Sequence, residues 1–413
     1  MSEPMYGLPT ERANPFDPPE VYRELRERCP VSKMRMPVSL DGRDGWLVTG
    51  LEEARALLAD NRFSHRKELI SLSIPSPIPL GDTKYEPDPA APGAFIGMDP
   101  PEHGRYRRML TGHFTVRRVR ELEPLIERVA ARYLDEMAAT GGPVDLVSGF
   151  AQPFPVELMC ELVGVPEWAR QPIVDHLAVV SRTTYTVEQI IEAVTELSAI
   201  LTKLVQEAKA APGGDDMLSA LVRLPELTDE ELVSLVWTVL GGGFDTSGNM
   251  LALGTFALLE HPDQLARLRA QPELLDNAIE ELLRYLTISQ FGASRAALED
   301  VEIGGQLIEK GQTVAVGLPA ANRDPNKFPD PDRLDICRAT QGHVAFGHGV
   351  HQCIGQNLAR MTLRVGYRML FDRFPTLRLA TPASEVPTGG DLLHYGVHKL
   401  MVTWDEPDPA AHS

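Results

Sequence analysis

Cysteine is scarce in this chain, and the few cysteines present show no sign of pairing. Only four occur among 413 residues, at Cys29, Cys160, Cys337 and Cys353. None belongs to a C-x-x-C pair or to a Cys/His cluster at zinc spacing, so the sequence argues against disulfides and structural zinc. Each cysteine is expected to be a free thiol, and most free thiols are small buried hydrophobic side chains.

Long apolar runs and basic charge are also lacking. No stretch reaches the roughly 18 uninterrupted apolar residues of a membrane span, and the N-terminal segment has no basic part followed by an apolar run. Forty Lys and Arg against 58 Asp and Glu give a net charge of −18, which repels a phosphate backbone. We therefore expect a cytoplasmic protein that binds neither membranes nor nucleic acid.

The remaining composition is that of a globular enzyme. Hydrophobic residues make up 43% and charged residues 24%, which is enough for a sizeable core and a cofactor. Neither a linker nor a repeat divides the 413 residues, so we predict a single, mainly α domain with a minor β region. Hydrophobic periodicity predicts β-rich parts in approximately residues 30–65, 290–320 and 385–405, the first with a short helix from Leu51, and helices in approximately residues 100–290 and 353–373.

One segment is rich in proline. Residues Ser73 to Gly93 read SIPSPIPLGDTKYEPDPAAPG. Prolines remove hydrogen-bond donors and restrict their neighbours, so this segment cannot form regular structure. Loops of this length are usually either functional or disordered, and we favour the interpretation of the stretch from about Arg66 to Met98 as a flap over a substrate.

The strongest motif surrounds one cysteine. It runs from Phe346 to Gly355 with the sequence FGHGVHQCIG, and the residues that follow have the apolar spacing of a helix. Cys353 is therefore expected at a helix N-terminus, where unpaired N–H groups and the helix dipole lower the pKa of a thiol. A single thiolate in a closed glycine-rich loop suits one axial position of haem iron better than zinc.

This loop resembles that of the cytochrome P450 family, F-x-x-G-x-H-x-C-x-G, at all five specified positions. The resemblance extends over nearly the whole chain and is strongest with the soluble bacterial members. It implies the cytochrome P450 fold, with haem b held between a long central helix and the cysteine loop. It also implies that Cys353 binds the iron and that Phe346 and Gly355 contact the haem.

The central helix is predicted from a capping box at Thr228–Glu231 to the residue before His261. About thirty residues would span roughly 45 Å. Three glycines, residues 241–243, cost such a helix about 1 kcal/mol each relative to alanine, so another requirement must keep them there. Close approach of a flat ligand is sufficient, and Gly242 is expected at the haem.

Asp245 and Thr246 follow these glycines, and two interpretations are open. They could form a satisfied polar pair, with Thr246 bonding to a carbonyl one turn earlier. The resemblance instead implies an acid and alcohol pair that relays protons to dioxygen. Phe244 stands where similar enzymes often carry a polar residue, and it is a candidate for the substrate pocket.

Glu281 and Arg284 lie three residues apart on one helix face. Alone they would be taken as a surface ion pair of little energetic value. With Arg333 they resemble the Glu-Arg-Arg network of the family, which secures the haem loop.

Four cations are candidates for the haem propionates: His103, Arg107, Arg295 and His351. Carboxylates in a low-dielectric interior need cations that bind them, and His103 and Arg107 lie four apart on one helix face. Individually, each is better explained as an ordinary solvated or ion-paired residue. The resemblance to the family favours their assignment to the propionates.

Arg360, Arg364 and Arg368 recur every fourth residue in the last long helix. A solvated helix face explains such a stripe. The alternative hypothesis is a docking surface for an acidic ferredoxin on the cysteine side of the haem.

The resemblance implies a monomeric monooxygenase that takes electrons from a ferredoxin and a ferredoxin reductase and inserts one oxygen atom of O2 into a C–H bond. We expect hydroxylation or epoxidation of a medium to large apolar molecule, such as an intermediate of secondary metabolism. Desaturation, oxidative coupling and a non-catalytic haem gas sensor are the alternatives, and a sensor has no need of Asp245 and Thr246. The expected pocket residues are Val239, Leu240, Gly243, Phe244, Ile288, Phe291 and Leu393.

Overall fold

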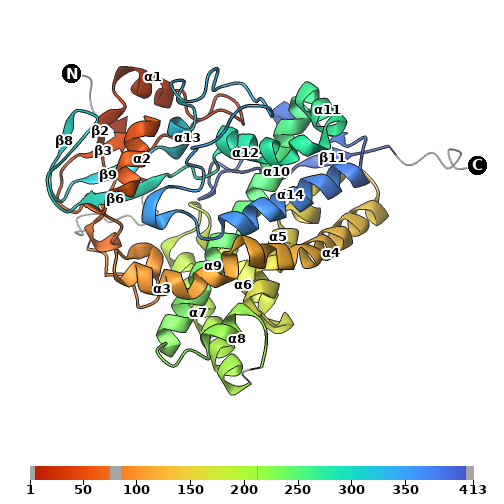
Figure 1. The fold of residues 1–413 in the computed structure, drawn as a ribbon, viewed down its shortest axis with the longest axis horizontal. Helices are drawn as coiled ribbons and strands as arrows, with labels where there is room; N and C mark the ends of the chain where they lie inside the picture. Colours follow the sequence, from red (N-terminus) through yellow and green to blue (C-terminus); the bar gives the residue numbers. More distant parts are fainter. Residues whose placement is uncertain (1–4, 75–85, 212, 406–413) are drawn as a thin grey trace, which may run out of the picture.

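The computed structural model describes residues 5–74, 86–211 and 213–405, and it is mainly helical (Figure 1). The α-helices are α1 (Val21–Arg28), α2 (Leu51–Ala59), α3 (Glu102–Thr111), α4 (Val116–Thr140), α5 (Pro153–Val163), α6 (Glu167–Val180), α7 (Val187–Ala210), α8 (Met217–Leu221), α9 (Asp229–Phe244), α10 (Thr246–Glu260), α11 (Pro262–Ala270), α12 (Leu275–Leu286), α13 (Leu318–Ala321) and α14 (Gln356–Arg373). Among the described residues, no helix is both long and apolar enough to span a bilayer.

The strands form two groups: most lie beside the N-terminus in Figure 1, and the others lie toward the side of the C-terminus. They are β1 (Met5–Tyr6), β2 (Val31–Arg35), β3 (Gly45–Val48), β4 (Phe63–Ser64), β5 (Val144–Asp145), β6 (Ala293–Ala297), β7 (Val301–Ile303), β8 (Gln306–Ile308), β9 (Thr313–Val316), β10 (Arg378–Leu379) and β11 (Met401–Thr403). Six form a mixed sheet in the order β1-β2-β3-β9-β6-β4, in which β3 and β9 run parallel with Trp46 opposite Val314. The sheet packs against α2 through a cluster that includes Trp46, Leu57 and Val314.

The hairpin β7–β8 turns on Gly304 and Gly305, as predicted, and both glycines have positive φ values of 54° and 72°. The predicted strand near residue 400 is β11, but both of its partners were missed, because β10 lies before the predicted range. β5 lies within the range predicted to be helical, and its Val144 pairs with Val402 of β11. The pairing is long-range, so the local pattern carried no signal for it.

The helical core is built around α10, whose side chains are buried on almost every face. A helix buried all round must be apolar all round, which explains the run from Met250 to Leu258. Helices α5, α12 and α14 contact α10, and α4 packs along α14 (Figure 1).

The predicted thirty-residue helix is two helices. The capping box at Thr228 and Glu231 is present, but α9 ends at Phe244 and α10 begins at Thr246. Asp245 between them has a φ of −112°, and the Thr246 hydroxyl donates to the carbonyl of Gly242 over 3.1 Å. Three glycines of low helix propensity precede this hydroxyl, so the series of helical backbone hydrogen bonds is weakest at this point.

The proline-rich segment is described only in part, because residues 75–85 lie outside the described ranges. Residues 86–93 have no helix or strand, as predicted, and Phe95–Gly97 form a single helical turn. Beyond it, α3 presents His103 and Tyr106 to the interior.

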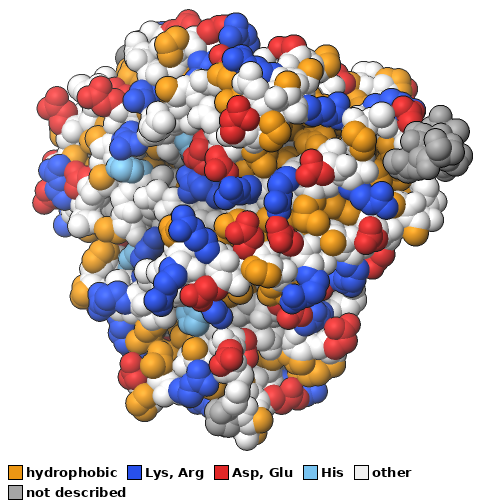
Figure 2. Space-filling view, turned by 45° about the vertical axis from the view of Figure 1, so that its right-hand side comes forward, with side chains coloured by type: hydrophobic (Ala, Val, Ile, Leu, Met, Phe, Trp, Pro, Cys, Tyr) orange, Lys and Arg blue, Asp and Glu red, His pale blue; other side chains and the backbone are white. Residues whose placement is uncertain are grey.

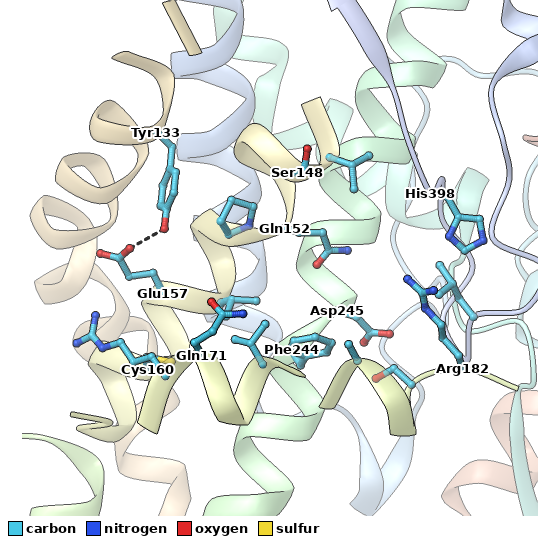
Figure 3. Close-up of a pocket in the computed structure, with 18 of the residues that line it drawn as sticks. Tyr133, Ser148, Gln152, Glu157, Cys160, Gln171, Arg182, Phe244, Asp245 and His398 are labelled. Carbon is cyan, nitrogen blue, oxygen red and sulfur yellow. Dashed lines mark hydrogen bonds between the residues drawn. The ribbon is translucent and has the colours of Figure 1, made fainter. Parts of the chain in front are cut away.

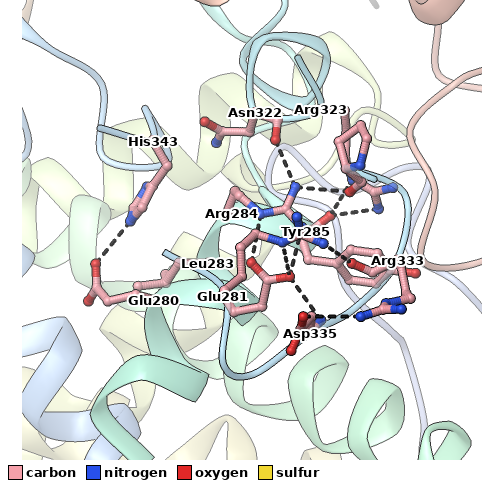
Figure 4. A network of polar contacts seen from close by, with 12 residues as sticks. Glu280, Glu281, Leu283, Arg284, Tyr285, Asn322, Arg323, Arg333, Asp335 and His343 are labelled. Carbon is pink, nitrogen blue, oxygen red and sulfur yellow. Dashed lines mark hydrogen bonds and ion pairs between the residues drawn. The ribbon is translucent and has the colours of Figure 1, made fainter. Parts of the chain in front are cut away.

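A buried carboxylate, Glu281, organises the coil that leads to the cysteine loop (Figure 4). Glu281 and Arg284 have no exposed side-chain area, and Arg284 Nε donates to Glu281 Oε2 over 2.7 Å. The predicted third arginine, Arg333, is wrong as a direct partner, because its side chain is 65% exposed and pairs with Asp335. Arg338 takes that place, with Nε 3.0 Å from Glu281 Oε1.

Further hydrogen bonds connect Arg284 to the segment just before the cysteine loop. Arg284 Nη1 donates to the carbonyls of Asn322 and Pro331. The Asn322 side chain in turn accepts the backbone N–H of Val344 over 2.7 Å, two residues before the loop begins. The network therefore spans from α12 to the cysteine loop.

We expect Arg338→Ala to lower the free energy of unfolding by about 3 kcal/mol, because it removes a partner of a fully buried carboxylate. Arg333→Ala is the matched control on the same coil and should cost under about 1 kcal/mol, since its ion pair is exposed. Denaturant unfolding of both variants measures the difference. Equal losses would show that Arg338 does not serve the buried charge.

Candidate functional site

A cavity of about 430 Å³ lies between α9, α10 and α14, with α3 and β6 closing one end. Most of the predicted site residues line it: His103, Arg107, Val239, Gly242, Gly243, Thr246, Ile288, Arg295, Phe346, His351, Cys353 and Gly355. The structure thus brings together residues from six parts of the chain.

Four predicted pocket residues do not line this cavity. Leu240 and Phe244 belong to the hydrophobic core or pack against it, and Phe244 also faces a groove on the far side of the α9–α10 junction. Phe291 packs against the cluster beneath the N-terminal strands. Leu393 is tied by its backbone N–H to the carbonyl of Ser181, and its neighbour His394 reaches the cavity instead.

The cysteine loop is a tight turn in front of α14. The backbone N–H of Cys353 donates to the carbonyl of Phe346 over 2.9 Å, and α14 begins three residues later at Gln356. Gly349 has a φ of 74°, and a Cβ there would lie 2.2 Å from the carbonyl oxygen of Leu58. This position therefore requires glycine for both reasons.

Cys353 opens to the cavity, but the expectation of a lowered thiol pKa is wrong for the protein by itself. Burial raises the pKa of Cys353, and this effect outweighs the opposing backbone N–H groups of Gly355 and Gln356 and the charges of Arg107 and Arg360. A thiolate here needs a further positive charge, as a bound metal ion supplies.

A cluster of histidine and arginine side chains faces the same cavity. The rings of His103 and His351 lie 4.1 Å apart, and the Nε2 atoms of both are buried without a hydrogen-bond partner among the described residues. Burial lowers the pKa of His103 to about 4 and that of His351 to about 2, and it lowers the pKa of Arg295 to about 10. Unpaired buried donors beside a cavity suit a ligand that carries carboxylates.

The opposite side of the cavity fits a flat ligand. A Cβ on Gly242 would meet no atom within 4 Å, because this glycine faces open space. Gly243 differs, since a Cβ there would lie 2.7 Å from the Met159 side chain. Close packing with α5 therefore explains Gly243, whereas the ligand argument applies to Gly242. Together with Cys353 and the cations, Gly242 makes the site fit a haem.

Reasoning from the sequence missed His65. Its ring lies 4.5 Å from that of His351, and burial lowers its pKa to about 4. It follows β4 and its Nδ1 contacts the carbonyl of Ile96. An isolated histidine in an unremarkable segment gave no signal of this position.

Asp245 and Thr246 face different surroundings. Thr246 lines the cavity and bonds back to Gly242, so the interpretation as a satisfied side chain holds for this hydroxyl. Asp245 lines a separate groove of about 860 Å³ on the far side of the junction, drawn in Figure 3. One carboxylate oxygen, Oδ1, lies 3.0 Å from His394 Nδ1.

The predicted basic stripe on α14 is present, but its charges are paired. Arg360 contacts Glu280 at 2.5 Å, Arg364 contacts Asp276 at 3.3 Å, and Arg368 pairs with Glu127. On the face shown in Figure 2, basic and acidic side chains are likewise interspersed. The stripe is therefore compensated by neighbouring helices and is not a free positive belt.

Comparison with known proteins gives close matches over almost the whole chain. The family model described as Cytochrome P450 matches residues 169–386. The chain is 43% identical to Cytochrome P450 105C1 from a Streptomyces species, over 96% of this chain and 97% of the relative. It is 40% identical to 6-deoxyerythronolide B hydroxylase from Saccharopolyspora erythraea, over 93% and 95% respectively. The crystal structure of CYP105P1 in complex with filipin I superposes with a TM-score of 0.89 at 40% identity, covering 98% of this chain and all of that one.

The buried histidines should make the ligand-free protein sensitive to acid. Unfolding restores the pKa of His65 and His103 from about 4 to the ordinary value of 6.5. Between these values the unfolded chain binds more protons than the folded chain, so the free energy of unfolding falls as pH falls from about 6.5 to 4. Urea titrations across this window measure the slope. His103→Gln should flatten the slope, and an unchanged slope would contradict the assignment.

Proposed function

The chain belongs to the cytochrome P450 monooxygenases, and we propose that it binds haem b through the Cys353 thiolate and oxygenates a medium to large apolar small molecule. The observation that carries the proposal is the position of Cys353, open to the cavity at the start of α14 and opposite Gly242. When bound, the haem supplies the activation of O2 and the oxidation of the C–H bond.

The chain's own residues would hold the cofactor. His103, Arg107, Arg295 and His351 would bind the two propionates, and two of them have buried, unpaired nitrogen atoms that support this role. Phe346 supports the cysteine loop from beneath, with the Arg360 guanidinium 4.6 Å from its ring centroid. Gly355 and Gln356 direct their backbone N–H groups toward the sulfur.

Thr246 and Asp245 would deliver the protons that the reaction consumes. Thr246 has its hydroxyl at the cavity wall, and Asp245 reaches the groove on the other side. A positioned acid of this kind typically contributes about a hundredfold or more to a rate.

The cavity walls support an apolar substrate. Val239, Ile288, Met159 and Leu283 present apolar side chains to it. Relatives at 40% identity include proteins named 6-deoxyerythronolide B hydroxylase and Vitamin D3 dihydroxylase, whose names denote large apolar molecules. We infer that an intermediate of secondary metabolism is hydroxylated or epoxidised here, in the cytoplasm.

Spectroscopy and isotope labelling test this function. The reduced holoprotein should give the red-shifted Soret band of a thiolate-ligated haem with carbon monoxide, and Cys353→Ser should lose this band. Apolar ligands that change the absorption spectrum of the holoprotein identify substrate candidates. With NADPH, ferredoxin and ferredoxin reductase, the product should contain one atom of isotopically heavy O2. A product without added oxygen would instead indicate desaturation or coupling.

Electrons would arrive on the cysteine side, where we propose that Arg364 and Arg368 help to dock a ferredoxin. Both side chains are nearly half exposed, at 48% and 45%, although each has an acidic partner. Charge complementarity of this kind mainly raises association rates and is weakened by salt.

The double reversal Arg364→Glu and Arg368→Glu should slow reduction by ferredoxin about tenfold and leave peroxide-driven turnover unchanged. Arg373→Glu is the matched control, because Arg373 is 46% exposed, ion-paired and further along the same helix. Stopped-flow reduction measures the rate. An equal loss of ferredoxin-driven and peroxide-driven turnover would contradict docking at this surface.

A further inference from the structure

The junction of α9 and α10 forms part of the wall between two hollows. Thr246 and Gly242 line the cavity with Cys353 on one side. Phe244 and Asp245 line the groove on the other side together with Arg182, and Figure 3 labels all three. Asp245 is thus placed where a proton from groove water could cross toward Thr246.

The Asp245 carboxylate is held at one oxygen only. Oδ1 lies 3.0 Å from His394 Nδ1, whereas Oδ2 is buried and has no hydrogen-bond partner among the described residues. When Asp245 is ionised it can only accept, so Nδ1 of His394 must carry the hydrogen. A buried unpaired carboxylate oxygen is costly, and a proton or a water molecule at Oδ2 would relieve that cost.

His394 is fixed by its own backbone. The N–H groups on either side of it, from Leu393 and Tyr395, donate to the carbonyls of Ser181 and Ile288 over 2.9 and 2.7 Å. Its own carbonyl accepts from Asn249 Nδ2 over 2.7 Å. The backbone that carries the imidazole is therefore held without help from Asp245, and the ring meets the carboxylate from this fixed backbone.

We propose that His394 is a positioning residue for proton delivery, an inference that rests on the proposed function. It binds Oδ1 of Asp245 and so leaves Oδ2 as the atom that carries the proton. Because Oδ2 is buried, a water molecule must enter from the groove to carry one solvent proton to it, which gives the neutral acid. The same proton then leaves toward Thr246 and the cavity, and the carboxylate is restored. No electron moves in this step.

Three variants of the holoenzyme test the role. His394→Leu removes the donor, His394→Asn keeps an N–H near the place of Nδ1, and Asp245→Asn removes the acid. His176→Leu is the matched control, because His176 also pairs with a carboxylate, Glu196 at 3.2 Å, but on α6 and α7. The probe is an alkoxycoumarin whose O-dealkylation releases a fluorescent phenol, with the carbon monoxide spectrum reporting intact holoenzyme.

NADPH-driven dealkylation by His394→Leu should fall on the order of tenfold, with more hydrogen peroxide released and a larger solvent deuterium isotope effect. Peroxide-driven dealkylation should fall much less than NADPH-driven dealkylation, because peroxide brings its own protons, and the loss that remains measures the contribution of His394 to the cavity wall. His394→Asn should recover most of the loss, His176→Leu should match the wild type, and His394→Leu should add no further loss to Asp245→Asn.

Equal loss in NADPH-driven and peroxide-driven reactions, or additive effects with Asp245→Asn, would overturn the role of His394. The melting temperatures of the two single variants and the double variant supply a readout that needs no turnover. The changes in melting temperature caused by the His394 and Asp245 substitutions are expected to be non-additive. Additive changes would refute the contact between the two side chains. A wild type that shows no NADPH-driven oxidation of any ligand would refute the proposed function, and the coupling would still decide the pair.

Discussion

The structure depends on the neutralisation of one carboxylate that has no access to solvent. Glu281 is held between Arg284 and Arg338, and Arg284 reaches onward to the carbonyls of Asn322 and Pro331. A charge buried in this way is tolerated only when its partners are exact in number and position. The long coil between β9 and α14 has little regular structure of its own, so these contacts determine where the cysteine loop can lie.

The interrupted central helix solves a different problem. In a continuous helix, the helical repeat alone would set the directions of the Asp245 and Thr246 side chains. The junction instead places the two side chains in separate surroundings. One residue meets the cavity and the other meets the groove. The glycines before the junction serve two purposes, because Gly242 faces open space and Gly243 accommodates Met159.

Features with a local physical cause could be predicted from the sequence. The capping box at Thr228, the turn at Gly304 and the helix after Cys353 all depend on neighbouring residues, and all are present. The same holds for Glu281 and Arg284 on one face of α12.

Features that depend on the path of distant segments could not be predicted. Arg333 and Arg338 lie on the same coil, and only its course decides that Arg338 reaches Glu281. Leu240 and Phe244 were assigned to the pocket from the resemblance to the family, but they point to the core and the groove. The pKa of Cys353 was misjudged because the helix terminus was visible in the sequence and the degree of burial was not.

Asn249 has a consequence for how this protein could change its selectivity. It is almost completely buried, donates to the carbonyl of His394 and accepts from Gln152 over 2.7 Å, and a Cβ on Gly396 would meet its side chain. The Asn249 side-chain amide fixes the C-terminal loop against α10, so this wall of the cavity is rigid. Asn249 would thus influence which substrate shapes bind without contacting the substrate. A substitution at this position could therefore change the selectivity of the protein.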